Sequence, residues 1–259
     1  MSDFFPVDGR PDRASVKRTL VLVFVIALVL GNLGGGVAGV VGALGTGAHE
    51  AGHAVFGDLL AGRVTSMTVF REGGGVTFTE VSDSWWRTFL VAGSGYPATL
   101  FAGLALLTAV LFGQATRVTA AVAAGISAFV WVFWVPFNSK VGFVSDAEQR
   151  FTWFLIGVTT LVFATVAAIP DRYEQARRVG LGVLAVGLLT DAFSAGRTLV
   201  IVEGSFGETA SDADALSQAV GVGSSAVWAW LLRGSLFVIA FLWARWALNR
   251  AGRPAPPYS

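Results

Sequence analysis

The 259-residue sequence contains no cysteine and only two histidines. Without cysteine the chain has no disulfide bonds, no thiolate metal ligands and no cysteine nucleophile. Charged residues are also scarce, at 14% of the chain, whereas soluble domains contain about 25%. The net charge is only +1, and no basic region with interleaved aromatic residues is present, so we expect no nucleic-acid partner.

Long apolar runs dominate the remaining sequence. Runs of about 18 or more apolar residues with few charges are typical of transmembrane helices. They predict an all-α polytopic membrane protein with six or seven transmembrane helices, an integral multi-pass protein of the cell membrane. We expect a polar segment at 1–18, one membrane-embedded domain at 19–249 and a disordered tail at 250–259. The apolar segments are 19–58, 88–113, 117–137, 151–170, 179–201 and 225–249.

The first apolar segment, 19–58, leaves the number of crossings open. Forty residues of helix would measure about 60 Å, against a hydrocarbon core of about 30 Å. A break is therefore expected in the glycine-rich stretch 31–36. With one crossing and the N-terminus inside, inside loops carry 11 Lys and Arg residues and outside loops carry five, as the positive-inside rule requires; two crossings give nine against seven. The segment lacks an A-x-A cleavage site, which favours a retained span over a signal peptide.

Both histidines belong to one short motif, His49-Glu50-Ala51-Gly52-His53. Residues i and i+4 share a helix face, so His49 and His53 could bind one metal ion. Glu50 lies about 100° further round the helix, where it could act as general base toward a zinc-bound water. The motif thus predicts a zinc hydrolase with Glu50 as its catalytic residue.

The third metal ligand must be an oxygen donor, because a catalytic zinc usually has three protein ligands and the chain has no further His or Cys. Asp191 is the favoured candidate, since a carboxylate within an apolar span is costly unless it is paired, protonated or bound to a cation. A bond to a neighbouring helix or a protonated carboxyl would also satisfy Asp191. Asp212 and Asp214 remain alternatives, although acids in a loop are usually just solvated. Asp58 faces away from both histidines.

Several segments beyond the motif could shape the site. Two β-branched runs flank a glycine turn at 63–82 and predict a β-hairpin, with a mobile glycine loop as the alternative. An open strand there could bind an extended substrate as an added strand. The glycine-rich segment 93–97 opens the next span, where it could serve helix packing or line a substrate route. The segment 203–219 is predicted to be an acidic loop.

Together these motifs resemble the M50 family of site-2-protease-like intramembrane zinc metallopeptidases, and most closely an M50B-like branch. The resemblance spans residues 37–232. It implies a zinc site formed by His49, His53 and a late acid, with Glu50 as base. One departure is that the Asn-Pro-Asp-Gly or Leu-Asp-Gly motif of typical members is replaced by Thr190-Asp191-Ala192. The motifs are His49-Glu50-Ala51-Gly52-His53, Gly62-Arg63-Val64, Ala92-Gly93-Ser94-Gly95-Tyr96-Pro97, Thr190-Asp191-Ala192 and Ser211-Asp212-Ala213.

The expected function is therefore that of a membrane-embedded zinc metalloendopeptidase that hydrolyses peptide bonds of membrane-anchored proteins. Its expected cofactor is Zn²⁺, and its expected partners are a membrane-anchored protein or peptide substrate and the lipid bilayer. The alternative is a catalytically inactive zinc-binding pseudoprotease that binds partners, although the presence of Glu50 disfavours it. A metal transporter would need polar residues on several spans, and these are few.

Overall fold

A computed structural model describes residues 11–33, 36–60, 63–71, 74–80, 84–113, 115–135, 144–201 and 211–251. Most of this part of the chain is helical, and the strands are confined to one hairpin. The elements in chain order are α1 (Arg13–Leu33), α2 (Gly36–Leu60), β1 (Arg63–Val69), β2 (Gly75–Glu80), α3 (Trp85–Ala92), α4 (Gly95–Phe112), α5 (Thr116–Trp134), α6 (Asp146–Ala168), the 3₁₀ turn η1 (Asp171–Tyr173), α7 (Glu174–Ile201), α8 (Asp212–Val220) and α9 (Ser225–Arg250).

The predicted hairpin is confirmed. β1 and β2 pair antiparallel, with Val69 opposite Gly75 and Met67 opposite Thr77, and a register irregularity lies between Val64 and Ser66. Gly74 has a φ of +77°, a conformation that favours glycine, so this residue enables the chain to reverse. Both strands pack against α2. The hairpin therefore lies beside the helix that carries the histidine motif.

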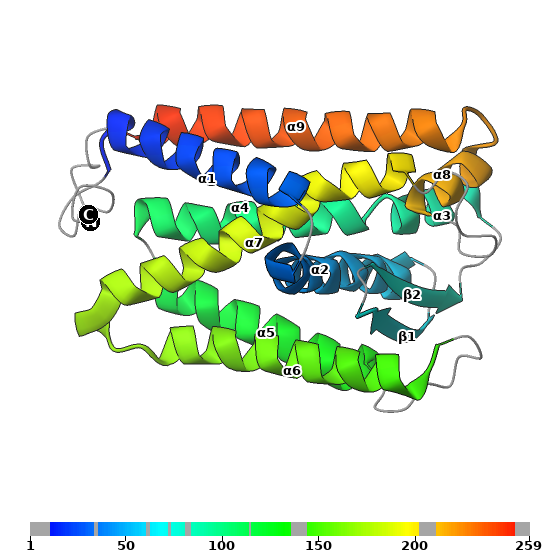
Figure 1. Cartoon of the computed structure of the whole chain (residues 1–259), viewed down its shortest axis with the longest axis horizontal. Coiled ribbons are helices and arrows are strands. Elements are labelled where there is room, and N and C mark those ends of the chain that lie inside the picture. Colours follow the sequence, from blue (N-terminus) through cyan, green and yellow to red (C-terminus); the bar gives the residue numbers. More distant parts are fainter. Residues whose placement is uncertain are drawn as a thin grey trace.

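The long helices run roughly along one axis of the molecule (Figure 1). The start of α1, the end of α4, the start of α5 and the start of α7 lie at one end, while the hairpin, α3 and α8 lie at the other. The helix α4 is the most enclosed and packs against α2, α7 and α9. Its buried leucines contact residues of α1, α7 and α9 in the main hydrophobic core.

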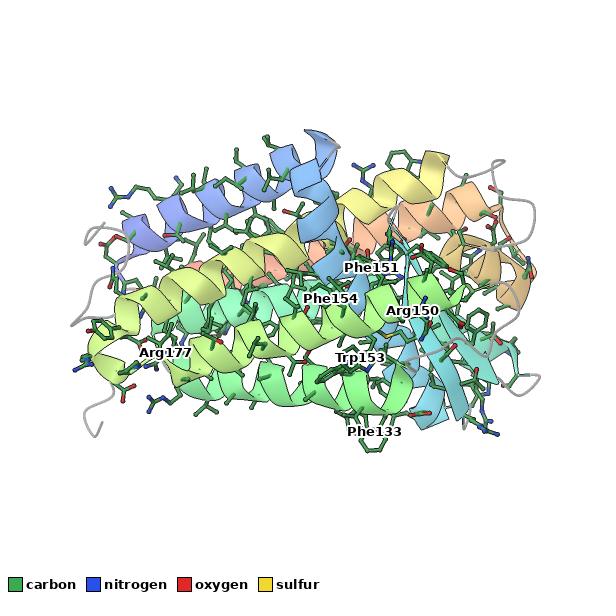
Figure 2. The ribbon with its side chains drawn as sticks, turned by 60° about the horizontal axis from the view of Figure 1, so that its bottom comes forward. Phe133, Arg150, Phe151, Trp153, Phe154 and Arg177 are labelled. Carbon is green, nitrogen blue, oxygen red and sulfur yellow. The ribbon has the colours of Figure 1, made fainter. Side chains whose placement is uncertain are left out.

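Four of the described helices are long and apolar enough to cross a membrane, namely α4, α5, α6 and α9. Many large apolar side chains of α5 and α6 point outward, and Phe133 and Phe154 are 67% and 64% exposed. Figure 2 turns this face forward and shows Phe133, Trp153 and Phe154 along it. Such an apolar exterior is unusual in a soluble protein and suits a lipid-facing surface. The chain is thus a mainly helical membrane protein, while the count of six or seven spans stays a prediction.

Several boundaries differ from the sequence predictions. In the glycine-rich stretch, α1 ends at Leu33 and α2 begins at Gly36, and the two residues between them lie outside the described part of the chain. The acidic segment 203–219 is not wholly a loop, since α8 begins at Asp212. An N-terminal capping box starts this helix: Ser211 and Asp214 each accept a hydrogen bond from the other's backbone N–H. The earlier part of this segment and most of the predicted tail lie outside the described residues.

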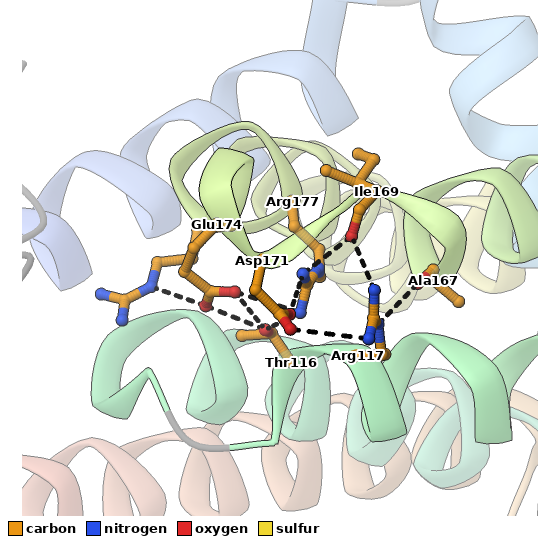
Figure 3. Close-up of polar contacts among 8 residues, drawn as sticks. Thr116, Arg117, Ala167, Ile169, Asp171, Glu174 and Arg177 are labelled. Carbon is orange, nitrogen blue, oxygen red and sulfur yellow. Dashed lines mark hydrogen bonds and ion pairs between the residues drawn. The ribbon is translucent and has the colours of Figure 1, made fainter.

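A polar network joins α5, η1 and α7 at the end of the molecule opposite the hairpin (Figure 3). The buried guanidinium of Arg177 forms ion pairs with Asp171 and Glu174, at 2.7 and 3.1 Å, and donates a hydrogen bond to the Ile169 carbonyl. Thr116 donates to Glu174 as well. The side-chain hydrogen bond from Arg177 lowers the pKa of Asp171. This network ties together helices whose other ends lie near the hairpin.

Candidate metal centre

The helix α2 presents the three motif residues as the i, i+4 spacing predicts. His49, Glu50 and His53 are all buried, with exposed fractions of 9%, 4% and 7%. The Nε2 atoms of the two imidazoles lie 3.0 Å apart. Both histidines therefore aim the same ring nitrogen at one point.

The short helix α8 brings Asp212 to that point. Its carboxylate oxygens lie 3.1 Å from His49 Nε2 and 3.2 Å from His53 Nε2. Ligands bound tetrahedrally at about 2.0–2.2 Å from a zinc ion lie about 3.3–3.6 Å from one another, close to these separations. His49, His53 and Asp212 thus form a group that could hold a metal ion.

The hydrogen bonding around His53 indicates that a cation belongs between these three groups. The Nδ1 of His53 lies 2.7 Å from the Val91 carbonyl, which can only accept a hydrogen bond, so Nδ1 carries a proton. In the neutral ring, Nε2 then presents a lone pair to the Asp212 carboxylate, which is itself an acceptor. One proton could bridge only one pair of these atoms, and two protonated Nε2 atoms only 3.0 Å apart would repel each other, whereas a metal ion would satisfy all three groups. The arrangement therefore fits a divalent metal, with Val91 as the outer partner that orients a metal-binding histidine.

Asp212 is charged in this setting. Burial would raise the pKa of its carboxyl group, but positive charge on the adjacent His53 and His49 would hold that pKa well below its usual value, and a bound divalent cation would supply such charge while both rings stay neutral. Its buried Oδ2 lies 3.1 Å from His49 Nε2 and meets no well-aligned hydrogen-bond donor among the described residues. An ionised, buried oxygen without a hydrogen bond is the kind of donor that a metal ion binds.

The hairpin holds the Glu50 carboxylate. Thr77 on β2 donates a hydrogen bond to Glu50 Oε2 at 2.7 Å and lies 3.0 Å from the Glu50 carbonyl. The backbone of Gly75 approaches so closely that any side-chain carbon there would lie 2.6 Å from Glu50 Cγ. Glu50 is thus fixed next to the two imidazoles, as a general base must be.

The segment between α3 and α4 closes the other side of the centre. A side-chain carbon at Gly95 would lie 2.6 Å from the Nε2 atoms of both His49 and His53. The ring of Tyr96 packs edge-on against that of His49, with centroids 4.3 Å apart. This segment was singled out in the sequence as a helix-packing element or a substrate route, and it packs directly on both imidazoles.

Asp191, the favoured third ligand from sequence, lies near the centre but outside the group of His49, His53 and Asp212 that could hold a metal ion. It is buried on α7, where its side chain packs against Gly45 of α2 and forms a hydrogen bond with Thr46. Thr46 lies one helical turn before His49, so Asp191 is adjacent to the motif. The carboxylate that meets the histidines belongs to Asp212, one of the two alternatives.

The other acids have structural partners. Asp214 accepts hydrogen bonds from Ser211 and Ser225 and so joins the starts of α8 and α9. Asp58 faces away from the histidines, as predicted, and accepts hydrogen bonds from the Val64 N–H and the Trp134 indole. It attaches α2 to β1 and α5 rather than contributing to the centre.

Two positioning contacts of this centre were not predicted from the sequence. Thr77 carries no motif of its own, and the Val91 carbonyl is a backbone group with no sequence signal. One sequence signal does favour Asp212 as a ligand. The Ser-x-x-Asp pattern of 211–214 indicates the start of a helix, where side chains have fixed positions.

Comparison with known protein families matches residues 19–245 to the family described as Peptidase M50B-like. Comparisons with curated proteins and with solved structures gave no match. The family match covers both histidines, Glu50 and Asp212 and most of the chain. It confirms the resemblance inferred from the motifs, and this protein belongs to the Peptidase M50B-like family.

Proposed function

We propose that this protein is a membrane-embedded zinc metalloendopeptidase of the multi-pass type, acting in the cell membrane on membrane-anchored proteins or peptides. The observation that carries the proposal is the meeting of His49, His53 and Asp212, from α2 and α8, beside the held carboxylate of Glu50. Family membership supports peptidase activity. The two-nitrogen, one-oxygen donor set is one that catalytic zinc sites use.

We propose Asp212, in place of Asp191, as the third ligand. The distances from its oxygens to both imidazoles support this assignment. Asp191 then has a different role at the α2–α7 contact, where Thr46 forms a hydrogen bond with its carboxyl group and Gly45 leaves room for its side chain.

Each residue around the centre would have its own role in peptide hydrolysis. A bound zinc ion would polarise the scissile carbonyl and lower the pKa of water at the site to about 7. Glu50 would accept the proton of the attacking water and deliver it to the leaving amine. The Thr77 hydroxyl would keep the Glu50 carboxylate oriented, and the Val91 carbonyl would keep His53 Nε2 unprotonated. An extended substrate would lie along the hairpin, which is the element that contacts Glu50.

Substitution of the base separates a protease from an inactive zinc-binding protein. Glu50→Gln keeps the size of the side chain and leaves all three metal-binding groups intact. We expect purified Glu50→Gln to retain zinc and to cleave a membrane-anchored peptide at least about 1,000-fold more slowly than the native protein, a loss that includes general-base catalysis worth 10²- to 10⁴-fold. Equal cleavage by both proteins would contradict the mechanism. Zinc binding without cleavage by either would favour the pseudoprotease.

A further inference from the structure

The outer edge of β1 is covered by a helix instead of a strand. On this edge, polar side chains of α6 occupy the positions that a neighbouring strand would take. The Thr152 hydroxyl accepts a hydrogen bond from the Val69 N–H at 2.8 Å and lies 3.0 Å from the Val69 carbonyl. The Gln149 amide donates to the Met67 carbonyl at 3.1 Å. Further along, the Glu148 carboxylate accepts from the Arg71 N–H at 3.0 Å.

The spacing of these contacts follows from strand geometry. In an antiparallel ladder the backbone groups of alternate residues point to the same edge. Residues 67, 69 and 71 are alternate, and their groups all turn away from β2 and toward α6. On α6 the partners 148, 149 and 152 share one helix face, because residues three and four apart are neighbours on a helix surface. Figure 2 shows Phe151 and Arg150 on α6, within the same turn.

The hydrogen bonds of Gln149 and Thr152 lie in the interior of the protein, whereas the one between Glu148 and Arg71 is exposed. Thr152 and Val69 have no exposed surface, and Gln149 is 1% exposed. Thr68 is also fully buried and donates to Gln149 Oε1 at 2.5 Å. Water could not readily replace a lost partner at such a site, so a backbone group deprived of its bond would stay unsatisfied or force the strand to move.

The pairing of the two strands places the residues that bond to α6 opposite residues that contact Glu50. Met67, held by Gln149, is the register partner of Thr77, which donates to Glu50. Val69, held by Thr152, is the register partner of Gly75, whose backbone packs on Glu50. The two strand residues that α6 holds are therefore those opposite the two residues that contact the base.

We propose that Gln149 and Thr152 are positioning residues, which serve as a substitute strand along β1 and so hold the hairpin against Glu50. This inference rests on the proposed protease function, and it adds to that function a role for residues on a different helix from any metal ligand. It also explains why α6 carries fully buried polar side chains within an otherwise apolar span.

The test compares two threonines of the same helix. Thr152→Val removes the hydroxyl at constant shape, and Thr159→Val is its matched control, because within the described part of the chain Thr159 bonds only to the Leu155 carbonyl of its own helix. We expect Thr152→Val to lower kcat on a membrane-anchored peptide by about 10- to 100-fold, as small displacements of catalytic groups do, with zinc content unchanged. Thr152→Ser should restore most of kcat, and Thr159→Val should match the native protein.

A second variant covers the case in which Thr152→Val does not fold. Gln149→Met removes the donor to Met67 at similar length, and we expect the same loss of kcat. Native kcat in whichever of the two folds, or an equal loss in Thr159→Val, would overturn the proposal. The Glu50→Gln protein separates the two ideas: if it cleaves as fast as the native protein, the proposed function fails, whereas Glu50-dependent cleavage with native kcat in Thr152→Val refutes only the positioning role.

Discussion

Glycines stand where the side chains of the candidate centre and the nearby Asp191 need space. A side chain at Gly45 would collide with Asp191, one at Gly75 with Glu50, and one at Gly95 with both imidazoles. Protein interiors pack densely, so a single added methyl group is felt when its neighbours cannot move. Ligands on a helix have little freedom to move, and these glycines therefore take part in the geometry of the site.

Substitution of Gly95 tests this point. We expect Gly95→Ala to displace the imidazoles of His49 and His53 and to lower zinc affinity by at least about 10-fold, as loss of outer contacts around a metal does. Gly234→Ala is the control, because a side chain at Gly234 on α9 would meet nothing within 4 Å. Isothermal titration with zinc checks both variants, and native affinity in Gly95→Ala would refute the close contact.

Only some residues of the candidate centre could be predicted from the sequence. The pair of histidines and Glu50 could be predicted, because i, i+4 spacing on a helix is a local property of the chain. The identity of the third carboxylate could not, since it depends on which distant helix packs against α2. The cost of an intramembrane acid made Asp191 the stronger candidate, yet a hydrogen bond with Thr46 offsets part of that cost without a metal ion.

At the scale of elements, α8 is a nine-residue helix that supplies one candidate ligand and is fixed by its first turn. Asp214 accepts from Ser211 at the helix start and from Ser225 at the start of α9. These bonds, with that of Ser211 first, lower the pKa of Asp214 below its ordinary value of 3.8. The orientation of Asp212 thus depends on a junction that the sequence analysis treated as part of a loop.

The lowered pKa gives the junction a defined pH dependence. A carboxyl whose pKa falls on folding adds stability that is fully present above pH 3.8 and is lost as the pH falls below it. We expect Asp214→Ala to lower the Tm by a constant amount between about pH 5 and 8, with the difference shrinking below about pH 4. Ser217→Ala on the same helix is the control, since it removes no titrating group. A difference that persists unchanged at pH 3 would contradict the account.

At the scale of the whole molecule, the helix directions bear on the number of crossings. The start of α1 lies at the same end as the start of α7, and the hairpin that follows α2 lies at the other (Figure 1). This arrangement favours a single crossing made by α1 and α2 together. A single crossing also gives the larger excess of Lys and Arg in the loops on one side of the membrane. Composition alone could not decide the number of crossings. After a glycine-rich break the chain can either reverse its direction or continue across the membrane.

The absence of cysteine allows a direct test of this topology. Ala14 and Tyr173 are both exposed, at the start of α1 and in η1. If α1 and α2 make one crossing, we expect Ala14→Cys and Tyr173→Cys to react with a membrane-impermeant maleimide from the same side of the bilayer. Val222→Cys, beyond α7, should react from the opposite side. Labelling of Ala14→Cys and Tyr173→Cys from opposite sides would establish two crossings instead.

Zinc affinity shows most directly which carboxylate completes the centre. It is measured by zinc titration of two purified variants, Asp212→Ala and Asp191→Ala. The account predicts that Asp212→Ala loses more than about 100-fold in affinity, beyond the 10- to 100-fold typical of outer-shell changes, while Asp191→Ala stays within that smaller range. Retention of native zinc affinity by Asp212→Ala, together with its loss in Asp191→Ala, would contradict the proposed centre.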